Sequence, residues 1–575
     1  MSKCAMTTLV RTITVAAGVY APGHLGSLTP IVSFELVDAL LEECGRVEQR
    51  LRDLPSRVGV YLVLAMGLFE QVGLALVYSK LVAGLSGLQV PAPSEAALRG
   101  LRRRVGPEPV KALFEVLAGP LAQPGTPGAC YRRYRTVAFD GCSSIKAPDH
   151  PRIVAYLGKV LHRQGLAGHP MLRLIALVET GTRGMLGAAF GGWETGEIDY
   201  ARRLLHLLGP GMLLLDDRGF DSNAFLAEVL ATKAQFLVRA MNTRKPPVLA
   251  ILPDGSYLTR IGQMRLRVIE ASVTAVSADG SSLTGTYRLL TTLLDHRIDP
   301  AAQLIALYHE RWEIESAYFA LRHTMLRGRV LRSKDRAGIE QELWGILALY
   351  QILRTAMVEA CEQVSGTDPD RAGFTIALET ARDHVVNATG IHDETGDPRG
   401  GIAPSILADL LPPRRPRVYA RVVKSPLSRY HRRPSQEQYP LTSTVITELH
   451  VLIHMPEQVT PPPQKTTRKT TPKPAKSRPT PTPKRPNPAR PRPPSREAAF
   501  VFLRQRPNHS AHAADLARDL GITGTRELNN FRTRMSQWST AGLLTKTGRA
   551  TYTLTTTHQR DPHHTTKTQP NTPDP

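Results

Sequence analysis

Apolar residues recur at helical spacing through the first 130 residues of the chain. They do so in three segments, FELVDALLEECG, VYLVLAMGLFEQVGLALVYSKLVAGL and PVKALFEVLAGPLA. The longest apolar run extends from Val58 to Phe69 and is ended by Glu70, so it is too short to cross a bilayer and predicts a buried helix. Residues 1–130 are therefore expected to form a helical N-terminal domain.

From about residue 131 the pattern changes to short apolar runs that are typical of strands. The segments TVAFDG, LRLIALVET, GMLGAAFGG and GMLLLDDRGF read as strands, and EIDYARRLLHLL has the apolar period of an amphipathic helix. This order predicts an α/β domain over residues 131–455, in which the first and the last of these strands end in Asp140 and Asp217. A later helix is expected to carry Glu315.

A β-rich insertion is predicted inside this domain, at about residues 236–295. Between Asp217 and Glu315 lie 97 residues, more than a single strand–helix connection needs. The middle of this stretch alternates, is rich in β-branched residues and carries turn signals at Asp254-Gly255 and Asp279-Gly280.

The last fifth of the chain has a different composition. Residues 461–496 contain 13 Pro and 11 Lys or Arg and no acidic residue, so the segment 456–496 is predicted to be a disordered basic linker. Residues 497–556 read as three helices and a two-stranded wing, a winged helix-turn-helix with Ser510 as the N-cap of its second helix. Residues 557–575 are expected to form a disordered tail.

Three carboxylates are the candidate catalytic and metal-binding residues: Asp140, Asp217 and Glu315. A single Asp at a strand end is usually a turn residue or a helix cap. Three carboxylates on successive elements of an α/β sheet can meet at its carboxyl edge, where open sheets build their sites. An all-oxygen site favours hard cations such as Mg²⁺ or Mn²⁺. Two such ions, roughly 3.5–4 Å apart, support in-line displacement at a phosphodiester, which points to nucleic acid.

A polar stripe is predicted on the helix around Glu315. Tyr308, Arg311, Glu315 and Arg322 have offsets of 0, 3, 7 and 14, which in a regular helix places them within an arc of about 60°. A phenol, two guanidinium groups and a carboxylate along one face suit a phosphate backbone. A solvated helix face with an i,i+4 Arg–Glu pair is the alternative interpretation.

These motifs resemble those of a known family. The spacing Tyr-x2-Arg-x3-Glu-x6-Arg, from Tyr308 to Arg322, is similar to the Tyr-x2-Arg-x3-Glu-x6-Lys signature of IS4-type insertion-sequence transposases, a DDE group. VAFDG around Asp140 and DRGF from Asp217 resemble the family's first two catalytic motifs, and VLRSKDRAGIEQELWGILALYQILR also matches in character. The resemblance covers about residues 30–435. Arg322 stands where the family usually has Lys, so the phosphate contact there can differ in geometry.

The resemblance implies an RNase H-like core and a DNA transposase that moves an insertion sequence by cut-and-paste. In such an enzyme Asp140, Asp217 and Glu315 bind two Mg²⁺ or Mn²⁺ ions and catalyse cleavage and strand transfer, while Tyr308, Arg311 and Arg322 hold DNA. The partners are the transposon ends and the target DNA, and two ends held together imply a homodimer on DNA. A metal-dependent nuclease on the same fold and a catalytically silent, transposase-derived DNA-binding regulator remain as alternatives.

Charge agrees with a polyanionic partner, because the net charge is +23 and the pI is about 10. Residues 461–575 carry 21 basic and 6 acidic residues, which is most of that excess. In the predicted winged helix the candidate DNA-binding residues are Arg526, Arg532 and Arg534; a protein-binding three-helix module is the alternative. The basic segment 414–433, with Tyr419 and Tyr430 between its arginines and lysine, suits phosphate contact and stacking.

The five cysteines are scattered without paired spacing, which favours a reducing compartment and argues against a zinc module. The apolar stretch at the N-terminus is broken by Arg11 and is not followed by a cleavage-like pattern. A cytoplasmic, nucleoid-associated protein without a membrane segment is expected.

Overall fold

The computed structural model contains two compact units, Met1–Gln464 and Lys465–Pro575. The described residues are 23–50, 52–85, 89–162, 165–277, 280, 282–309, 311, 317–389, 401–413, 417–418, 444–456, 496–522, 525–540, 542–548 and 550–555. The predicted linker and tail, most of the basic segment 414–433 and Glu315 lie outside them.

The N-terminal region is helical, as predicted. Its helices are α1 (Phe34–Glu43), α2 (Ser56–Leu68), α3 (Leu74–Val82), α4 (Glu95–Val105) and α5 (Glu108–Leu117). The hydroxyls of Ser33 and Ser94 accept hydrogen bonds from the first turns of α1 and α4, which satisfies donors that a helix start leaves unpaired. All residues of α2 except Arg57 are buried, so the longest apolar run is a buried helix.

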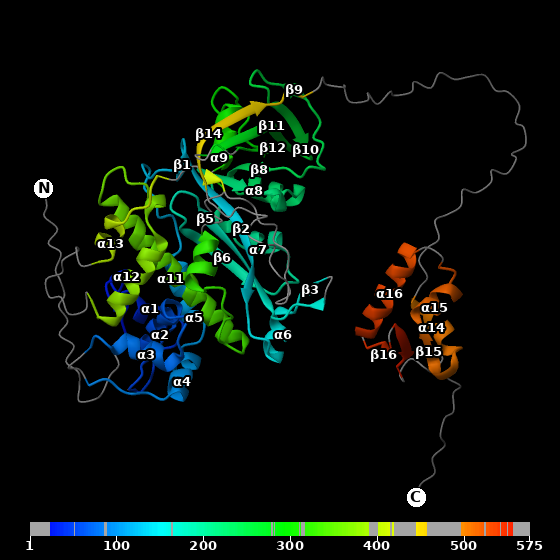
Figure 1. Cartoon of the computed structure of the whole chain (residues 1–575), viewed down its shortest axis with the longest axis horizontal. Coiled ribbons are helices and arrows are strands. Elements are labelled where there is room, and N and C mark those ends of the chain that lie inside the picture. Colours follow the sequence, from blue (N-terminus) through cyan, green and yellow to red (C-terminus); the bar gives the residue numbers. More distant parts are fainter. Residues whose placement is uncertain are drawn as a thin grey trace, which may run out of the picture. The chain divides into compact units, whose positions relative to one another are not determined.

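A mixed sheet forms the core of the larger unit (Figure 1). Five of its strands lie in the order β8-β7-β2-β5-β6. β7 and β8 run parallel to β2, β5 pairs antiparallel with β2, and β6 pairs antiparallel with β5. Their bounds are β2 (Tyr134–Lys146), β5 (Met171–Glu179), β6 (Met185–Gly191), β7 (Met212–Asp216) and β8 (Gln235–Arg239). With α7 (Glu197–Arg202) between β6 and β7, this is the predicted RNase H-like arrangement. The short strand β1 (Cys130–Tyr131) precedes β2, and the smaller elements between β2 and β5 are α6 (Pro151–Leu157), β3 (Leu161–His162) and β4 (Gly165–Leu166).

The predicted insertion continues the same sheet. Its strands are β9 (Ala250–Ile251), β10 (Tyr257–Ile261), β11 (Met264–Ser277) and β12 (Ser282–Thr291), and β12 pairs with β8. The prediction that the insertion begins near residue 236 was wrong, because β8 pairs in parallel with β7 and is the fifth strand of the core. On the far side, β11 pairs with β14 (Thr444–Ile453), which in turn pairs with β13 (Arg417–Val418). A strand far along the chain therefore completes the insertion.

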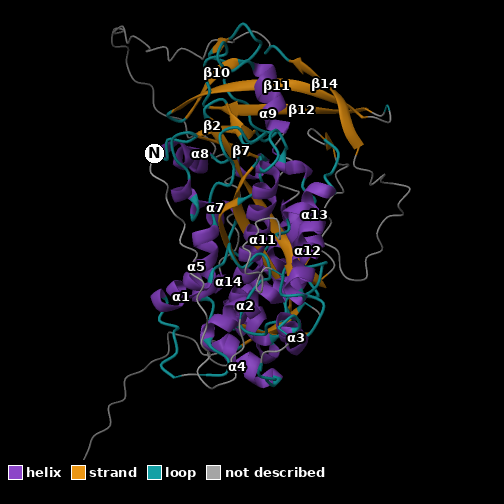
Figure 2. Ribbon diagram, turned by 90° about the vertical axis from the view of Figure 1, so that its left-hand side faces the viewer, coloured by secondary structure: helices purple, strands orange, loops and turns teal. Residues whose placement is uncertain are grey.

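Helices cover both faces of the sheet (Figure 2). On one face, α8 (Asn223–Ala231) and α7 pack with Val137, Phe139 and Leu214. On the other, the side chains of Ala138 and Leu213 belong to the main core, which includes α9 (Ala301–His309) and the long α11 (Arg336–Glu362). The same core also includes residues of α12 (Phe374–Val386) and α13 (Ala403–Ala408).

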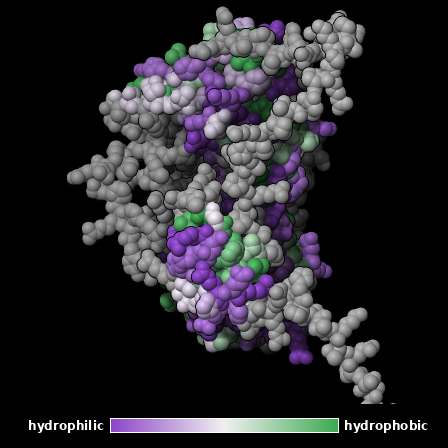
Figure 3. All heavy atoms as spheres, turned by 90° about the vertical axis from the view of Figure 1, so that its right-hand side faces the viewer, coloured by the Kyte–Doolittle hydropathy of each residue, from purple (hydrophilic) through white to green (hydrophobic). Residues whose placement is uncertain are grey.

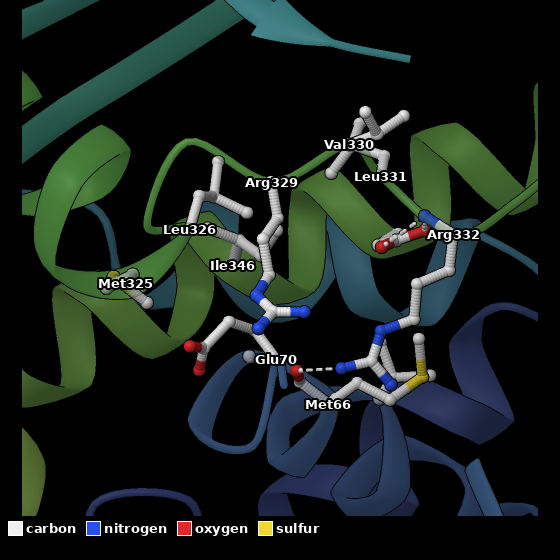
Figure 4. Close-up of a pocket in the computed structure, with 12 residues that line it drawn as sticks. Met66, Glu70, Met325, Leu326, Arg329, Val330, Leu331, Arg332 and Ile346 are labelled. Carbon is white, nitrogen blue, oxygen red and sulfur yellow. Dashed lines mark hydrogen bonds between the residues drawn. The ribbon is translucent and has the colours of Figure 1, made fainter. Parts of the chain in front are cut away.

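The segment before α11 joins the N-terminal helices to the core (Figure 4). Arg332 donates from its guanidinium to the carbonyl oxygens of Met66 (3.3 Å) and Phe69 (2.8 Å) at the end of α2. The Glu342 carboxylate on α11 accepts from the main-chain N–H groups of Arg332 (2.9 Å) and Ser333 (3.1 Å). These contacts hold Arg332 and Ser333 between the end of α2 and α11.

The arginine-rich segment 100–107, with consecutive Arg102, Arg103 and Arg104, contributes to the same junction. Arg102 donates to Gln341 Oε1 and Ser333 Oγ, both at 3.0 Å, and Arg104 donates to the carbonyl of Leu54 (2.8 Å). Arg103 is exposed. Two of the three consecutive arginines are therefore internal contacts rather than a free basic surface.

The smaller unit has the topology of a winged helix, as predicted. Its elements are α14 (Arg496–Arg504), β15 (Ser510–His512), α15 (Ala513–Asp519), α16 (Thr525–Thr540), β16 (Leu544–Gly548) and β17 (Thr551–Leu554), and the sheet order is β15-β17-β16. The predicted cap was wrong: Ser510 lies in β15 and its hydroxyl accepts from Thr553 (3.0 Å). His512 caps α15 instead, through Nδ1 and the N–H of Ala514.

Within the described ranges, no helix is long and apolar enough to cross a membrane. On the face shown in Figure 3, hydrophilic residues predominate and hydrophobic ones form small patches between them.

Candidate catalytic site

The first two candidate carboxylates lie side by side on neighbouring parallel strands. Arg135 pairs with Met212 and Val137 with Leu214, and extending this register by three residues brings Asp140 level with Asp217. The hydrogen bond from the Phe139 N–H to Asp216 Oδ1 keeps the two chains together up to that level. Adjacent strands are about 4.8 Å apart, so the two main chains come close at this level. Alternation along each strand turns both side chains to the face of Ala138 and Leu213, and the backbone of Asp217 is still extended (φ −87°, ψ 179°).

The sequence predicts that each aspartate ends a strand, but the two aspartates have different positions. Asp140 lies within β2, which continues to Lys146 through an irregular pairing after Cys142. Asp217 immediately follows β7 and caps the short helix Arg218–Phe220, with Oδ1 accepting from the N–H of Gly219 (2.6 Å). Both carboxylates are half-buried, so solvent or a ligand can still reach them.

Asp216, which the sequence interpretation passed over, points to the opposite face of the sheet. Its carboxylate is fully buried, and Oδ1 accepts from the main-chain N–H of Phe139 (2.9 Å). Burial raises the pKa of Asp216 well above its usual range, while the Phe139 N–H acts in the opposite direction. The hydrogen bond ties β7 to β2 one residue before Asp140 and Asp217.

Tyr308 does not present its hydroxyl to solvent as the polar stripe predicted. It is the penultimate residue of α9 and only 2% exposed, and its hydroxyl donates to the carbonyl oxygen of Asp216 (3.0 Å). Arg311 is also buried, at 4% exposed, with its guanidinium 5.9 Å from the centre of the Tyr308 ring. Both residues thus lie against the sheet beside Asp217 instead of along an exposed helix face.

A cavity of about 470 Å³ opens beside Asp217. Arg239 at the end of β8 stacks over Tyr287 of β12 (4.4 Å), and the Tyr287 ring meets that of Tyr308 edge to face (6.0 Å). The wall therefore presents two tyrosine rings between two guanidinium groups, which suits phosphates and planar rings. The residues that line it are Asp217, Arg218, Gly219, Arg239, Met241, Asn242, Thr243, Tyr287, Tyr308 and Arg311.

The chain after Glu315 departs from a regular helix. Residues 317–319 are helical, and Ala320–Met325, which includes Arg322, is a π-helix, so the predicted arc calculated for 3.6 residues per turn does not extend to Arg322. Arg322 is half-buried and close to β2: burial raises the pKa of the Cys142 thiol, and the Arg322 charge opposes that rise. Glu315 itself lies outside the described residues.

Tyr318, which sequence reasoning did not select, contacts the Asp140 strand directly. Its hydroxyl donates to the carbonyl oxygen of Asp140 (2.6 Å) and accepts from the N–H of Ala176 (3.0 Å). Burial raises the pKa of Tyr318 well above its usual range, so the hydroxyl stays protonated and can donate. A tyrosine three residues after a glutamate carries no local signal of this role.

A buried ion pair positions α9 from the insertion. Arg267 of β11 is fully buried and bonded to Asp254, and it also donates to the carbonyl of Asp299 (2.6 Å). The Asp254 carboxylate accepts from the N–H of Ala301, the first residue of α9 (2.9 Å). The insertion thereby holds the helix that carries Tyr308.

The donor chemistry of the site fits hard divalent cations. Asp140 and Asp217 offer carboxylate oxygens on one face, level with each other. No cluster of three His, Cys, Asp or Glu residues at metal-binding spacing occurs among the described residues, which do not include Glu315. The four described cysteines are free.

The candidate DNA-binding residues of the smaller unit lie on α16. Arg532 is exposed and Arg534 half-buried, and both follow Phe531, which packs in the core of this unit. Arg526 is on the first turn of the same helix, with its side chain outside the described residues.

Comparisons with known proteins agree with this fold. The model of the insertion element 4 transposase N-terminal domain matches residues 22–115, and that of the transposase DDE domain matches residues 132–352. The transposase InsG for insertion sequence element IS4, from Escherichia coli (strain K12), is 27% identical over 430 residues, which is 72% of this chain and 95% of that protein. A cryo-EM structure of the piggyBac transposase synaptic complex with hairpin DNA overlaps 68% of this chain and 85% of that one, at 10% identity and a TM-score of 0.35, too low to carry weight.

The RNase H-like sheet and the two matched models define a DDE transposase. The chain belongs to the IS4 family, and it is an enzyme that cleaves and transfers DNA. The alternatives of a silent regulator or a simple nuclease are not favoured. Enzymes of the DDE family generally depend on divalent metal ions, and DNA is the partner. Neither family model reaches the winged-helix unit, because the second one stops at residue 352.

Proposed function

We propose that this transposase mobilises an insertion sequence by cut-and-paste, with Asp140, Asp217 and Glu315 as the ligands of two Mg²⁺ or Mn²⁺ ions. The observation that supports the proposal is the shared level and shared face of Asp140 and Asp217 on adjacent parallel strands. Bound ions of this kind activate a water or a 3′-hydroxyl and stabilise the leaving oxygen of a phosphodiester. Glu315 is included on the strength of its place in the family signature.

The protein's own groups would hold DNA around this point. The cavity beside Asp217 offers Arg239, Arg311 and the rings of Tyr287 and Tyr308, a wall that suits phosphates and planar bases. Arg322, half-buried near β2, would neutralise a phosphate on the Asp140 side. Because two element ends have to be brought together, we propose that a homodimer forms on DNA, at the nucleoid in the cytoplasm.

The winged helix is proposed as a second DNA-binding unit. The second helix of a helix-turn-helix usually enters the major groove, and in this unit that helix is α16. It carries Arg526, Arg532 and Arg534. Residues 461–575 carry 21 basic residues against 6 acidic ones, which supports contact with a polyanion.

The proposal is tested by replacing each of the three carboxylates, one at a time, with its neutral amide. Asp140→Asn, Asp217→Asn and Glu315→Gln keep side-chain volume and remove a ligand charge, so each should lower end cleavage by at least about 10³-fold while DNA affinity is retained. Cleavage and joining of a labelled end substrate would be measured with Mg²⁺ and with Mn²⁺. Full activity in any one variant removes that residue from the proposed ligand set.

A further inference from the structure

Two tyrosines donate to main-chain carbonyls of the two strands that carry the candidate metal ligands. Tyr308 donates to Asp216, the residue before Asp217 on β7, and Tyr318 donates to Asp140 on β2. Both side chains are nearly fully buried, at 2% and 4% exposed. They come from the helical layer on the face toward which Asp140 and Asp217 point.

The Tyr318 hydroxyl lies between two strands. Asp140 and Ala176 are direct partners in the antiparallel pairing of β2 and β5, and the hydroxyl binds the carbonyl of the one and the N–H of the other. The strand on which Asp140 sits is therefore held to its neighbour and to the helical layer by one group. Just beyond, after Cys142, the β2–β5 register shifts, so the ladder alone is weakest there.

Asp216 adds a third hydrogen bond to those made by the two tyrosine hydroxyls. Its carbonyl receives the Tyr308 hydroxyl, and its carboxylate receives the Phe139 N–H. β7 is thus fastened both to α9 and to β2 directly beside Asp140. The two hydroxyls and this carboxylate together fix the main chain from which both aspartates project.

We infer that Tyr308 and Tyr318 are positioning residues that set the spacing of the metal-binding carboxylates. Neither hydroxyl is a metal ligand in this arrangement, because each is committed to main-chain groups. Outer contacts of this kind orient the groups that bind a metal, and their loss usually weakens metal affinity 10–100-fold. The inference rests on the proposed ligand set. Glu315 lies between the two tyrosines in the sequence, so both helical segments that flank it are anchored.

The experiment compares Tyr318→Phe and Tyr308→Phe with a matched control, Tyr350→Phe. The Tyr350 hydroxyl is buried, donates to the carbonyl of Arg183 (2.9 Å) and accepts from Arg354 (3.1 Å), so the control removes an equivalent hydroxyl in α11. End cleavage by the full chain would be measured over a Mg²⁺ series and a Mn²⁺ series, together with melting temperature and affinity for the end DNA.

Tyr318→Phe should raise the Mg²⁺ concentration for half-maximal cleavage about 10-fold, and Tyr308→Phe should shift it in the same direction. Saturating Mn²⁺, which binds such sites more tightly, should restore the rate. Tyr350→Phe should lower the melting temperature as much without changing the metal dependence. Metal curves equal to that control in both variants would overturn the inference. If Tyr318→Phe does not fold, Tyr308→Phe decides. Asp140→Asn in the same series reports separately on the ligand set, because full activity there would contradict the proposed function itself.

Discussion

The larger unit and the winged-helix unit use arginine in opposite ways. In the larger unit several guanidinium groups are internal: Arg267 is 0% exposed, Arg183 3% and Arg382 5%. They bond to Asp254, Asp370 and Glu70 respectively. In the smaller unit Arg532 is exposed, and the side chain of Arg518 is 78% exposed.

This difference shows that net charge is a poor measure of DNA contact. A buried guanidinium is neutralised by its partner and contributes little field at the surface, whereas an exposed one remains available to a phosphate. The larger unit is therefore expected to bind DNA mainly around its catalytic face, and the smaller unit through its exposed arginines. Each half of that comparison can be tested.

The largest effect is expected where a buried guanidinium is removed. Arg267→Ala leaves Asp254 without its partner and loosens the start of α9, so it should destabilise the protein by about 3–5 kcal/mol. Arg265→Ala, two residues earlier on the same strand and exposed, is the control and should stay within about 0.5 kcal/mol. Urea unfolding measures both. Equal losses in the two variants would mean that burial does not distinguish these arginines.

A smaller but clear effect is expected from removing the C-terminal region. Truncation after Met455 keeps β14, the strand that pairs with β11, so the larger unit should stay folded. Affinity for duplex DNA should fall roughly 10- to 100-fold, and the slope of log affinity against log salt should become shallower by roughly 0.9 for each lost phosphate contact. Binding across a salt series provides the measurement. An unchanged slope would favour a protein-binding module instead.

The recognition helix should show a more selective effect. Arg532→Ala combined with Arg534→Ala should weaken binding to a preferred sequence about 10-fold more than binding to random duplex, because base contacts carry discrimination. Arg518→Ala, on α15, is the control and should weaken both duplexes alike. Selection of bound sequences followed by titration would measure this. Equal losses on both duplexes in the double variant would restrict α16 to phosphate contacts.

The smallest effect is expected at Arg322. Arg322→Lys restores the residue that the family signature usually carries and keeps the charge, so cleavage should change less than about threefold. Arg322→Ala should lower cleavage more, since no charge remains beside β2. Both would be assayed at a fixed, saturating metal concentration. Strong loss in the Lys variant would indicate that the bidentate fork is needed.

Local pattern was sufficient for the order of elements and for the places of Asp140 and Asp217 in or directly after a strand. Strand-like runs predicted β2, β5, β6 and β7, and the family motifs at Asp140 and Asp217 lie on adjacent strands because that order closes an RNase H-like sheet. Helix period likewise predicted the N-terminal helices. The catalytic roles of Asp140, Asp217 and Glu315 stay predictions.

Which of those elements pair and pack with one another was decided only by the tertiary structure. The hydrophobic period of a segment indicates whether that segment is a helix or a strand. Which other segments it contacts depends on residues far away in the sequence. Thus β14 completes the insertion from more than 160 residues beyond β11, and Ser510 pairs with a strand instead of capping a helix. The hydroxyls of Tyr308 and Tyr318 are buried against Asp216 and Asp140 for the same reason, since no spacing within one helix shows which carbonyl of a distant strand a side chain will meet.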